Sequence, residues 1–150
     1  MIGTTRDAER LKVGRRLGAD VTLEADETDI VADVKALGDG FGAHLVVDCV
    51  GTSAALKPCM EMTRPRGQIT KVGWGKDPVG FSLDPIVQKA ITLQGSFSHT
   101  YGTWERVISL MAGGKLDLEP MRRVFPLDRW EEAFKTMDSL AIAKSVLTPT

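Results

Sequence analysis

One stretch in the middle of the chain restricts its fold more than any other. The apolar run HLVVDCV at positions 44–50 has the length and composition of a strand that is buried on both faces of a parallel sheet. A helix is expected over 54–63 and a second strand over 68–72. Glycine follows each strand, at Gly51 and Gly73, where a chain that turns sharply or approaches a ligand needs a residue without a side chain. Two parallel strands joined by a crossover helix predict a ligand crevice at the carboxyl ends of the strands, as in half of a nucleotide-binding sheet.

The rest of the chain continues the alternation of strands and helices. Polar residues that cap helices and glycines that end them mark the boundaries, with Asp7 and Gly18 around the first helix and Asp128 before the last. Further strands are expected over 1–5, 19–23, 89–94, 121–125 and 144–147, and further helices over 8–17, 30–37, 84–87, 104–111 and 129–137. The pattern predicts one alternating α/β chain without repeats or linkers.

Composition excludes several classes of function. A chain of 150 residues is long enough for one domain with its own core, and its formal charge of −1 gives no field for nucleic acid or an anionic membrane. Cys49 and Cys59 lack the spacing of a disulfide framework or a metal site, and we expect both to be buried thiols of a reducing compartment. No apolar run approaches the ~20 residues of a membrane span, and no export signal is visible. A cytoplasmic protein is expected.

Six short sequence words occur in order along the chain. They are D-x-x-R-L-x-x-G-x-x-L-G-A-D at 7–20, V-D-C-x-G at 47–51, R-P-x-G at 64–67, Q-G-S-F at 94–97, F-P-L-D at 125–128 and A-I-A-K at 141–144. Each word alone is common, but the ordered set resembles the C-terminal part of the zinc-containing medium-chain dehydrogenases, the superfamily of alcohol, sorbitol and threonine dehydrogenases. The resemblance implies an α/β fold with a doubly wound, mostly parallel Rossmann-type sheet.

The resemblance also shows what this chain lacks. In the family a zinc-bearing catalytic domain comes first, followed by the first Rossmann strand and its G-x-G-x-x-G loop. No such loop after a strand and no Cys/His/Glu set with zinc-ligand spacing occurs here. Residues 1–150 are therefore expected to be a partial dinucleotide-binding domain of such an enzyme, without the first strand and without the catalytic zinc domain.

The missing first strand is the central one in the strand order 3-2-1-4-5-6. The strand that ends at Thr5 and the strand that begins at His44 would each have an unpaired edge, which is a poor state for apolar strands. We expect that another chain or a rearranged strand fills the gap, or that the strands pair in an order foreign to the family.

Three residues near the N-terminus are candidates for the adenosine end of a cofactor. Relatives that prefer NAD carry an acidic residue where this chain has Thr5, and the following Arg6 suits a 2′-phosphate because guanidinium binds phosphate bidentately. Arg10 matches a position where some relatives use arginine. The resemblance thus favours NADP over NAD, and the alternative is a solvated helix face that happens to be basic.

The nicotinamide end is expected at the glycine turns. The resemblance implies cofactor contacts from Val50, Gly51, Val72, Gly73, Trp74, Ser96 and Phe97, and a contact between the pyrophosphate and Lys144. Without it, the two glycines would be ordinary turn residues and Lys144 a surface charge. Asp48 is interpreted as an acceptor for loop amides, and no catalytic or metal-binding residue is identified, because His44 and His99 have no visible partners.

The leading hypothesis is the NAD(P)-binding part of an oxidoreductase that transfers hydride between an alcohol or polyol and nicotinamide. Zinc would act only in the missing catalytic domain, so the chain alone would be inactive. One alternative is a truncated, non-enzymatic module that self-associates and binds nucleotide weakly or not at all. Another is a different doubly wound enzyme such as a methyltransferase, which fits the Trp104 and Lys144 segments worse. The strand around 90–94 matches an edge that pairs across the dimer in many relatives, so a homo-oligomer is expected.

Overall fold

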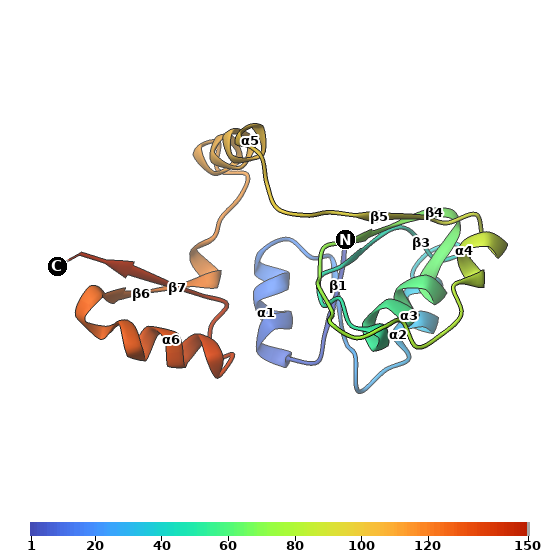
Figure 1. Ribbon diagram of the computed structural model, residues 1–150, viewed down its shortest axis with the longest axis horizontal. Coiled ribbons are helices and arrows are strands. Elements are labelled where there is room, and N and C mark those ends of the chain that lie inside the picture. The colour runs from blue at the N-terminus through green and yellow to red at the C-terminus, as the bar shows by residue number, and fades with distance from the viewer. Residues whose placement is uncertain (150) are drawn as a thin grey trace.

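The structure, a computed structural model, describes residues 1–149 as alternating strands and helices (Figure 1). In chain order the elements are β1 (Ile2–Thr5), α1 (Ala8–Arg16), β2 (Val21–Glu24), α2 (Ile30–Ala36), β3 (Ala43–Asp48), α3 (Ser53–Met62), β4 (Thr63–Lys71), α4 (Asp84–Gln88), β5 (Thr92–Gly95), α5 (Tyr101–Ala112), the 3-10 turn η1 (Glu119–Met121), β6 (Arg122–Pro126), the 3-10 turn η2 (Leu127–Arg129), α6 (Trp130–Asp138) and β7 (Lys144–Thr148). Every helix and strand expected from the sequence is present, and the largest shift is at the start of β4.

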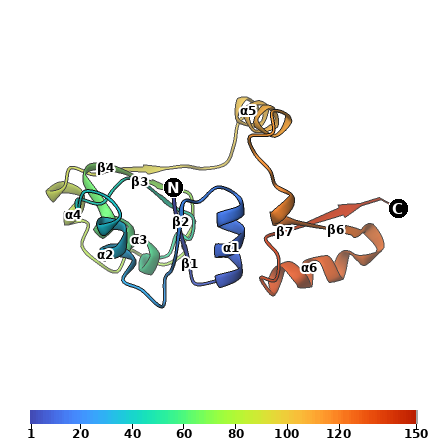
Figure 2. The same cartoon turned by 180° about the vertical axis from the view of Figure 1, so that it is seen from behind.

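The strands form three small sheets, and every strand pair within residues 1–149 is parallel. β1 pairs with β2, β3 with β4 and β4 with β5, and β6 with β7. In both views β1 and β2 lie between α1 on one side and α2 and α3 on the other (Figures 1 and 2). This arrangement confirms the α/β, Rossmann-type fold class.

One apolar core joins the first two sheets. Its buried members come from α2, β3, α3, β4 and the residue before β5, and they are Val34, Val46, Leu56, Met60, Met62, Ile69 and Ile91. Ile2 of β1 and Leu23 of β2 pack against this core. The core therefore fixes β1–β2 and β3–β4–β5 to the same helical layer, although no strand within residues 1–149 joins the two sheets.

The gap between β1 and β3 is open in the described part of the chain. Within residues 1–149 neither strand pairs with another element on the edge that faces away from its partner. The expectations of a rearranged strand in this gap and of a foreign strand order are wrong, because each strand pairs with the neighbour to which its own crossover helix connects it. Whether another chain fills the gap remains a prediction.

β3 is buried on one face only. Val46 and Asp48 lie beneath α3, whereas Leu45 and Val47 are 57% and 51% exposed. The expectation of a strand buried on both faces is therefore wrong. The helices α2, α3 and α4 lie on one side of the three-stranded sheet (Figures 1 and 2), so the opposite face keeps its apolar side chains in contact with solvent.

Two further expectations need correction. Asp128 does not cap the last helix, because it lies in η2, and α6 begins after Arg129 without a side-chain cap. Cys49 is exposed and only Cys59 is partly buried, because Cys49 follows the last residue of β3 and lies outside the strand. Asp7, Asp29 and Thr52 do cap α1, α2 and α3 through their side-chain oxygens.

The C-terminal part forms a unit of its own. β6, α6 and β7 make a parallel pair with one helix, around the buried residues Phe125 and Ala133. The connecting helix α5 buries no residue and stands apart from the sheets (Figure 1). None of the helices within residues 1–149 has the length and hydropathy needed to cross a membrane.

Candidate functional site

The carboxyl ends of β3, β4 and β5 meet at one edge of the three-stranded sheet. Their register aligns Asp48, the last residue of β3, with Lys71 of β4 and with Gly95 of β5. Seven of the residues predicted to contact a cofactor follow these ends directly: Val50, Gly51, Val72, Gly73, Trp74, Ser96 and Phe97. The fold therefore brings this predicted group together at a single edge.

Asp48 organises the first two turns. Its buried carboxylate accepts hydrogen bonds from the amides of Val50 and Gly51 through Oδ1, at 3.0 and 2.9 Å. Its backbone carbonyl accepts from the amides of Val72 and Gly73, at 2.9 and 2.8 Å. The interpretation of Asp48 as an acceptor for loop amides is confirmed, and one residue thus fixes the start of both turns.

The two turns pack backbone against backbone. A Cβ atom at Gly73 would lie 2.4 Å from the amide nitrogen of Gly51, and one at Gly75 would lie 2.4 Å from the Gly51 carbonyl oxygen. Gly51 also has a φ of +86°, which residues with a side chain rarely adopt. Glycine is therefore required at each of these positions by contact between the turns.

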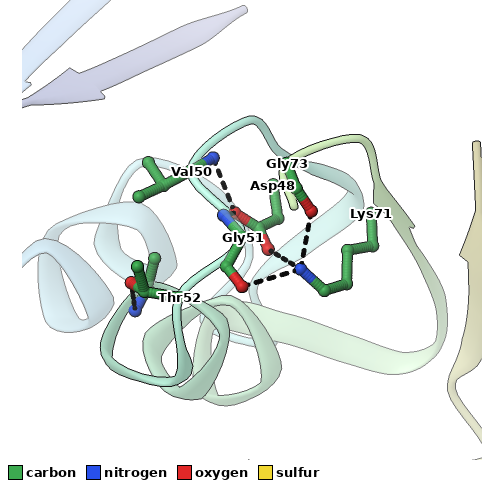
Figure 3. Close-up of polar contacts among 7 residues, drawn as sticks. Asp48, Val50, Gly51, Thr52, Lys71 and Gly73 are labelled. Atoms are coloured by element: carbon green, nitrogen blue, oxygen red, sulfur yellow. Dashed lines mark hydrogen bonds and ion pairs between the residues drawn. The ribbon is translucent and has the colours of Figure 1, made fainter. Parts of the chain in front are cut away.

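A lysine that the sequence did not single out joins the same turns (Figure 3). Lys71 Nζ donates to the carbonyl oxygens of Gly51 at 2.9 Å and Gly73 at 2.7 Å, and lies 3.5 Å from Asp48 Oδ2. The only sign of Lys71 in the sequence is that a charged residue lies near the end of an otherwise uncharged strand over 68–72. Its meaning depends on the register that aligns it with Asp48, which the sequence does not give.

The outer surface of the turns is apolar. Trp74 and Phe97 are 79% and 82% exposed, and their rings meet edge to face with centroids 5.9 Å apart. Val50 and Val72 are exposed beside them, and the Ser96 amide donates to the Lys71 carbonyl at 2.9 Å. The edge therefore presents apolar side chains outward, while the hydrogen bonds of Asp48, Lys71 and Ser96 are made within the turns.

The predicted adenosine-end residues lie at the end of β1. Arg6 forms an ion pair with Asp26 through Nε at 3.0 Å, and both side chains are largely exposed. Arg10 Nε lies 3.3 Å from Asp7 Oδ2, and Thr5 Oγ1 accepts a hydrogen bond from the Asp7 amide. Both arginines thus lie next to acidic side chains.

Lys144 lies apart from the other predicted residues. It is the first residue of β7, is exposed, and is aligned with Arg122 of β6. In Figures 1 and 2 α1 stands between the β6–β7 pair and the other sheets. The structure therefore does not bring Lys144 to the carboxyl edge of β3–β5.

The described residues do not provide a zinc site. Residues 1–149 contain no group of three or more His, Cys, Asp or Glu side chains close enough to hold a metal ion. Cys59 lies on α3 below the turns, where burial, aided by the charge of Asp48, raises the pKa of its thiol to about 11. A protonated thiol of this kind is a weak nucleophile at neutral pH.

Comparison with known proteins decides the family. A family profile described as zinc-binding dehydrogenase matches residues 1–113, which is three-quarters of the chain. The chain belongs to the zinc-binding dehydrogenase family. The match includes the whole carboxyl edge of β3–β5 and stops after α5, before the β6–α6–β7 unit.

Relatives of this zinc-binding dehydrogenase chain are longer. It is 32% identical to a sorbitol dehydrogenase of Halalkalibacterium halodurans, a match that covers 98% of this chain and 43% of the relative. It is 33% identical to a D-arabitol-phosphate dehydrogenase of Enterococcus avium, covering 89% of this chain and 39% of that protein. The solved alcohol dehydrogenase TADH from Thermus sp. ATN1 superposes with a TM-score of 0.90 at 26% identity, over 99% of this chain and 44% of that structure. The chain thus spans less than half the length of the relatives it matches.

Proposed function

We propose that this chain is the cofactor-binding part of an NAD(P)-dependent alcohol or polyol dehydrogenase. The observation that carries the proposal is the pair of interlocked glycine turns at the carboxyl ends of β3 and β4. Ligands of parallel α/β sheets bind at these ends, where backbone without side chains allows close approach. The family membership and the similarity to sorbitol and D-arabitol-phosphate dehydrogenases support the reaction class.

The exposed edge of β3–β5 is assigned to the nicotinamide half of the cofactor. Val50, Val72, Trp74 and Phe97 offer an apolar surface to a planar ring, and Gly51 and Gly73 let the two turns that carry these side chains pack together. Ser96 lies at the third strand end beside them. The exposed apolar side chains at this edge support its assignment to the nicotinamide ring.

The end of β1 is assigned to the adenosine half. Thr5 carries no charge that would repel a phosphate, and Arg6 keeps its terminal guanidinium nitrogens for a ligand while Nε faces Asp26. Arg10 lies one helical turn further along α1. These residues support NADP over NAD.

The catalytic zinc of the complete enzyme is assigned to residues outside this chain, since the described residues do not fit it. In such an enzyme the metal polarises the oxygen of the substrate alcohol. The role of this chain is to bind and orient the dinucleotide, and we expect no turnover from it alone.

Calorimetric titration of the 150-residue chain with NADPH and NADH tests the proposal. Saturable binding of either dinucleotide with a stoichiometry of one supports it. Absence of heat with both, under conditions where the chain is folded by circular dichroism, contradicts it.

A second candidate function rests on the open strand edges. Among the described residues, 1–149, β1 and β3 each have an unpaired edge, and Leu45 and Val47 are exposed on β3. These features promote association between chains. β5 is also exposed along its whole length, in keeping with a homo-oligomer. Sedimentation equilibrium measures the self-association, which the dehydrogenase reading also expects. Self-association together with no dinucleotide binding in the titration favours the non-enzymatic module.

A further inference from the structure

Lys71 occupies the space between the two glycine turns (Figure 3). Its ammonium group contacts one carbonyl from each turn, that of Gly51 at 2.9 Å and that of Gly73 at 2.7 Å. The same group lies 3.5 Å from the carboxylate of Asp48, which already holds the amides of Val50 and Gly51. A single cation therefore links both turns to a buried anion.

All three donors of the ammonium group have a partner in the protein. A lysine ammonium has three N–H bonds, and the three acceptors around Lys71 are two carbonyl oxygens and one carboxylate oxygen. The side chain is 28% exposed, and that of Asp48 is 1% exposed. Lys71 thus has no donor left for a bound ligand, and its contribution to binding must act through the turns.

We propose that Lys71 is a positioning residue that holds the turns of Gly51 and Gly73 in the conformation that accepts the nicotinamide half of the cofactor. The inference rests on the proposed function and adds a residue to it. Contact between the turns keeps them together, but contact alone does not set the direction of their carbonyls. The ammonium group turns the Gly51 and Gly73 carbonyls inward, so that the ligand meets the apolar side chains of Val50, Val72 and Trp74.

Removal of the cation has a local consequence. In a Lys71→Met variant an unbranched apolar side chain replaces the lysine stem without its ammonium group, so the Gly51 and Gly73 carbonyls lose their shared donor. Asp48 keeps the two amide hydrogen bonds to its Oδ1, so the start of the first turn is retained. We expect the turns to become mobile while the sheet stays folded. The adenosine end, at the end of β1, is not in contact with Lys71 and should not respond.

The experiment compares Lys71→Met with the matched control Lys57→Met, in which an exposed lysine of α3 loses its ion pair with Glu61. Two quantities are measured on the 150-residue chain. Amide hydrogen exchange of residues 50–51 and 73–75 reports the order of the turns without any ligand. Calorimetry gives the affinities for NADH and for ADP-ribose, which lacks the nicotinamide.

The expected result is faster exchange in the turns and about tenfold weaker binding of NADH by Lys71→Met, which corresponds to the loss of hydrogen bonds to a charged group. Binding of ADP-ribose should change by less than about twofold, and Lys57→Met should resemble the wild type. Equal losses for NADH and ADP-ribose, or unchanged exchange in the turns, overturn the inference. A third outcome is faster exchange in Lys71→Met while the wild-type chain binds neither nucleotide. It overturns the proposed function, and with it the assignment of the turns to nicotinamide.

Discussion

A methyl group added to Gly51 would stand 2.2 Å from the carbonyl carbon of Gly73. The two residues belong to turns that follow different strands, and their backbones are in direct contact. Neither turn can move outward independently of the other, since Asp48 holds the amides of both. The candidate cofactor edge is therefore one interlocked structure and not two flexible loops.

We expect Gly51→Ala to lower the free energy of unfolding by about 3 kcal/mol, from a positive φ and a backbone clash together. Gly18→Ala is the matched control, because Gly18 has a φ of +100° but open space around its Cβ position. It should cost about 1 kcal/mol, the strain of the positive φ alone. Urea denaturation followed by circular dichroism measures both. Equal costs at the two positions would show that the contact between the turns is not as tight as described.

Local signals were sufficient to predict the order of the elements. The side chains of Asp7, Asp29 and Thr52 cap their helices by accepting hydrogen bonds from backbone amides. Gly18 and Gly51 adopt a positive φ where the chain turns. These features depend on a few neighbouring residues, so the sequence alone contains them.

Features that depend on distant residues were not predictable in the same way. The contact of Lys71 with Gly51 and Asp48 needs the register between β3 and β4, and that register includes an irregularity between Ala43 and Leu45. The apolar run of β3 predicted burial on both faces, yet Leu45 is exposed, because burial depends on which element covers each face of the sheet. Arg66, at the irregular start of β4, adopts a φ of 60° in the segment that the sequence left between the helix over 54–63 and the strand over 68–72.

Alkylation at about pH 8 should distinguish the two cysteines. Burial raises the pKa of the Cys59 thiol to about 11, so only on the order of a thousandth of it is thiolate at this pH, and the thiolate is the reactive form. Cys49 is exposed at the end of β3. Brief treatment with iodoacetamide followed by mass spectrometry of the peptides should show Cys49 modified and Cys59 intact. In urea both should react, and modification of Cys59 at the rate of Cys49 in the folded chain would contradict its placement in α3.

Acid should weaken the link between the start of β3 and the start of β4. The side chain of Arg64 donates to Asp39 at 2.8 Å and holds the pKa of that carboxyl below its ordinary value of 3.8. Because the folded state binds this proton less tightly than the unfolded state, the contribution of Asp39 is present above about pH 4 and is lost as the pH falls through the lowered pKa.

The comparison of wild type with Asp39→Asn isolates this carboxyl, because His44, which also contacts Arg64, is the same in both proteins. We expect the wild type to be more stable at about pH 6 and the difference to shrink toward about pH 3. Urea denaturation at a series of pH values checks this. A difference that stays constant over the series would show that the charge of Asp39 makes no contribution.

The basic residue after β1 offers the sharpest test of cofactor preference. If Arg6 binds the 2′-phosphate, Arg6→Ala should lower the affinity for NADPH about tenfold, because a charge-assisted pair is lost. The affinity for NADH should stay nearly unchanged, because NADH lacks that phosphate. Arg16→Ala is the control, because Arg16 is an exposed arginine at the other end of α1 and reports only the change in net charge. Calorimetric affinities for both cofactors decide the outcome.

Asp26 forms an ion pair with Arg6 and therefore competes with a 2′-phosphate for its guanidinium group. Asp26→Asn should therefore strengthen NADPH binding. Equal losses of NADPH and NADH in Arg6→Ala would refute the 2′-phosphate assignment and leave Arg6 as a solvated residue of a basic helix end.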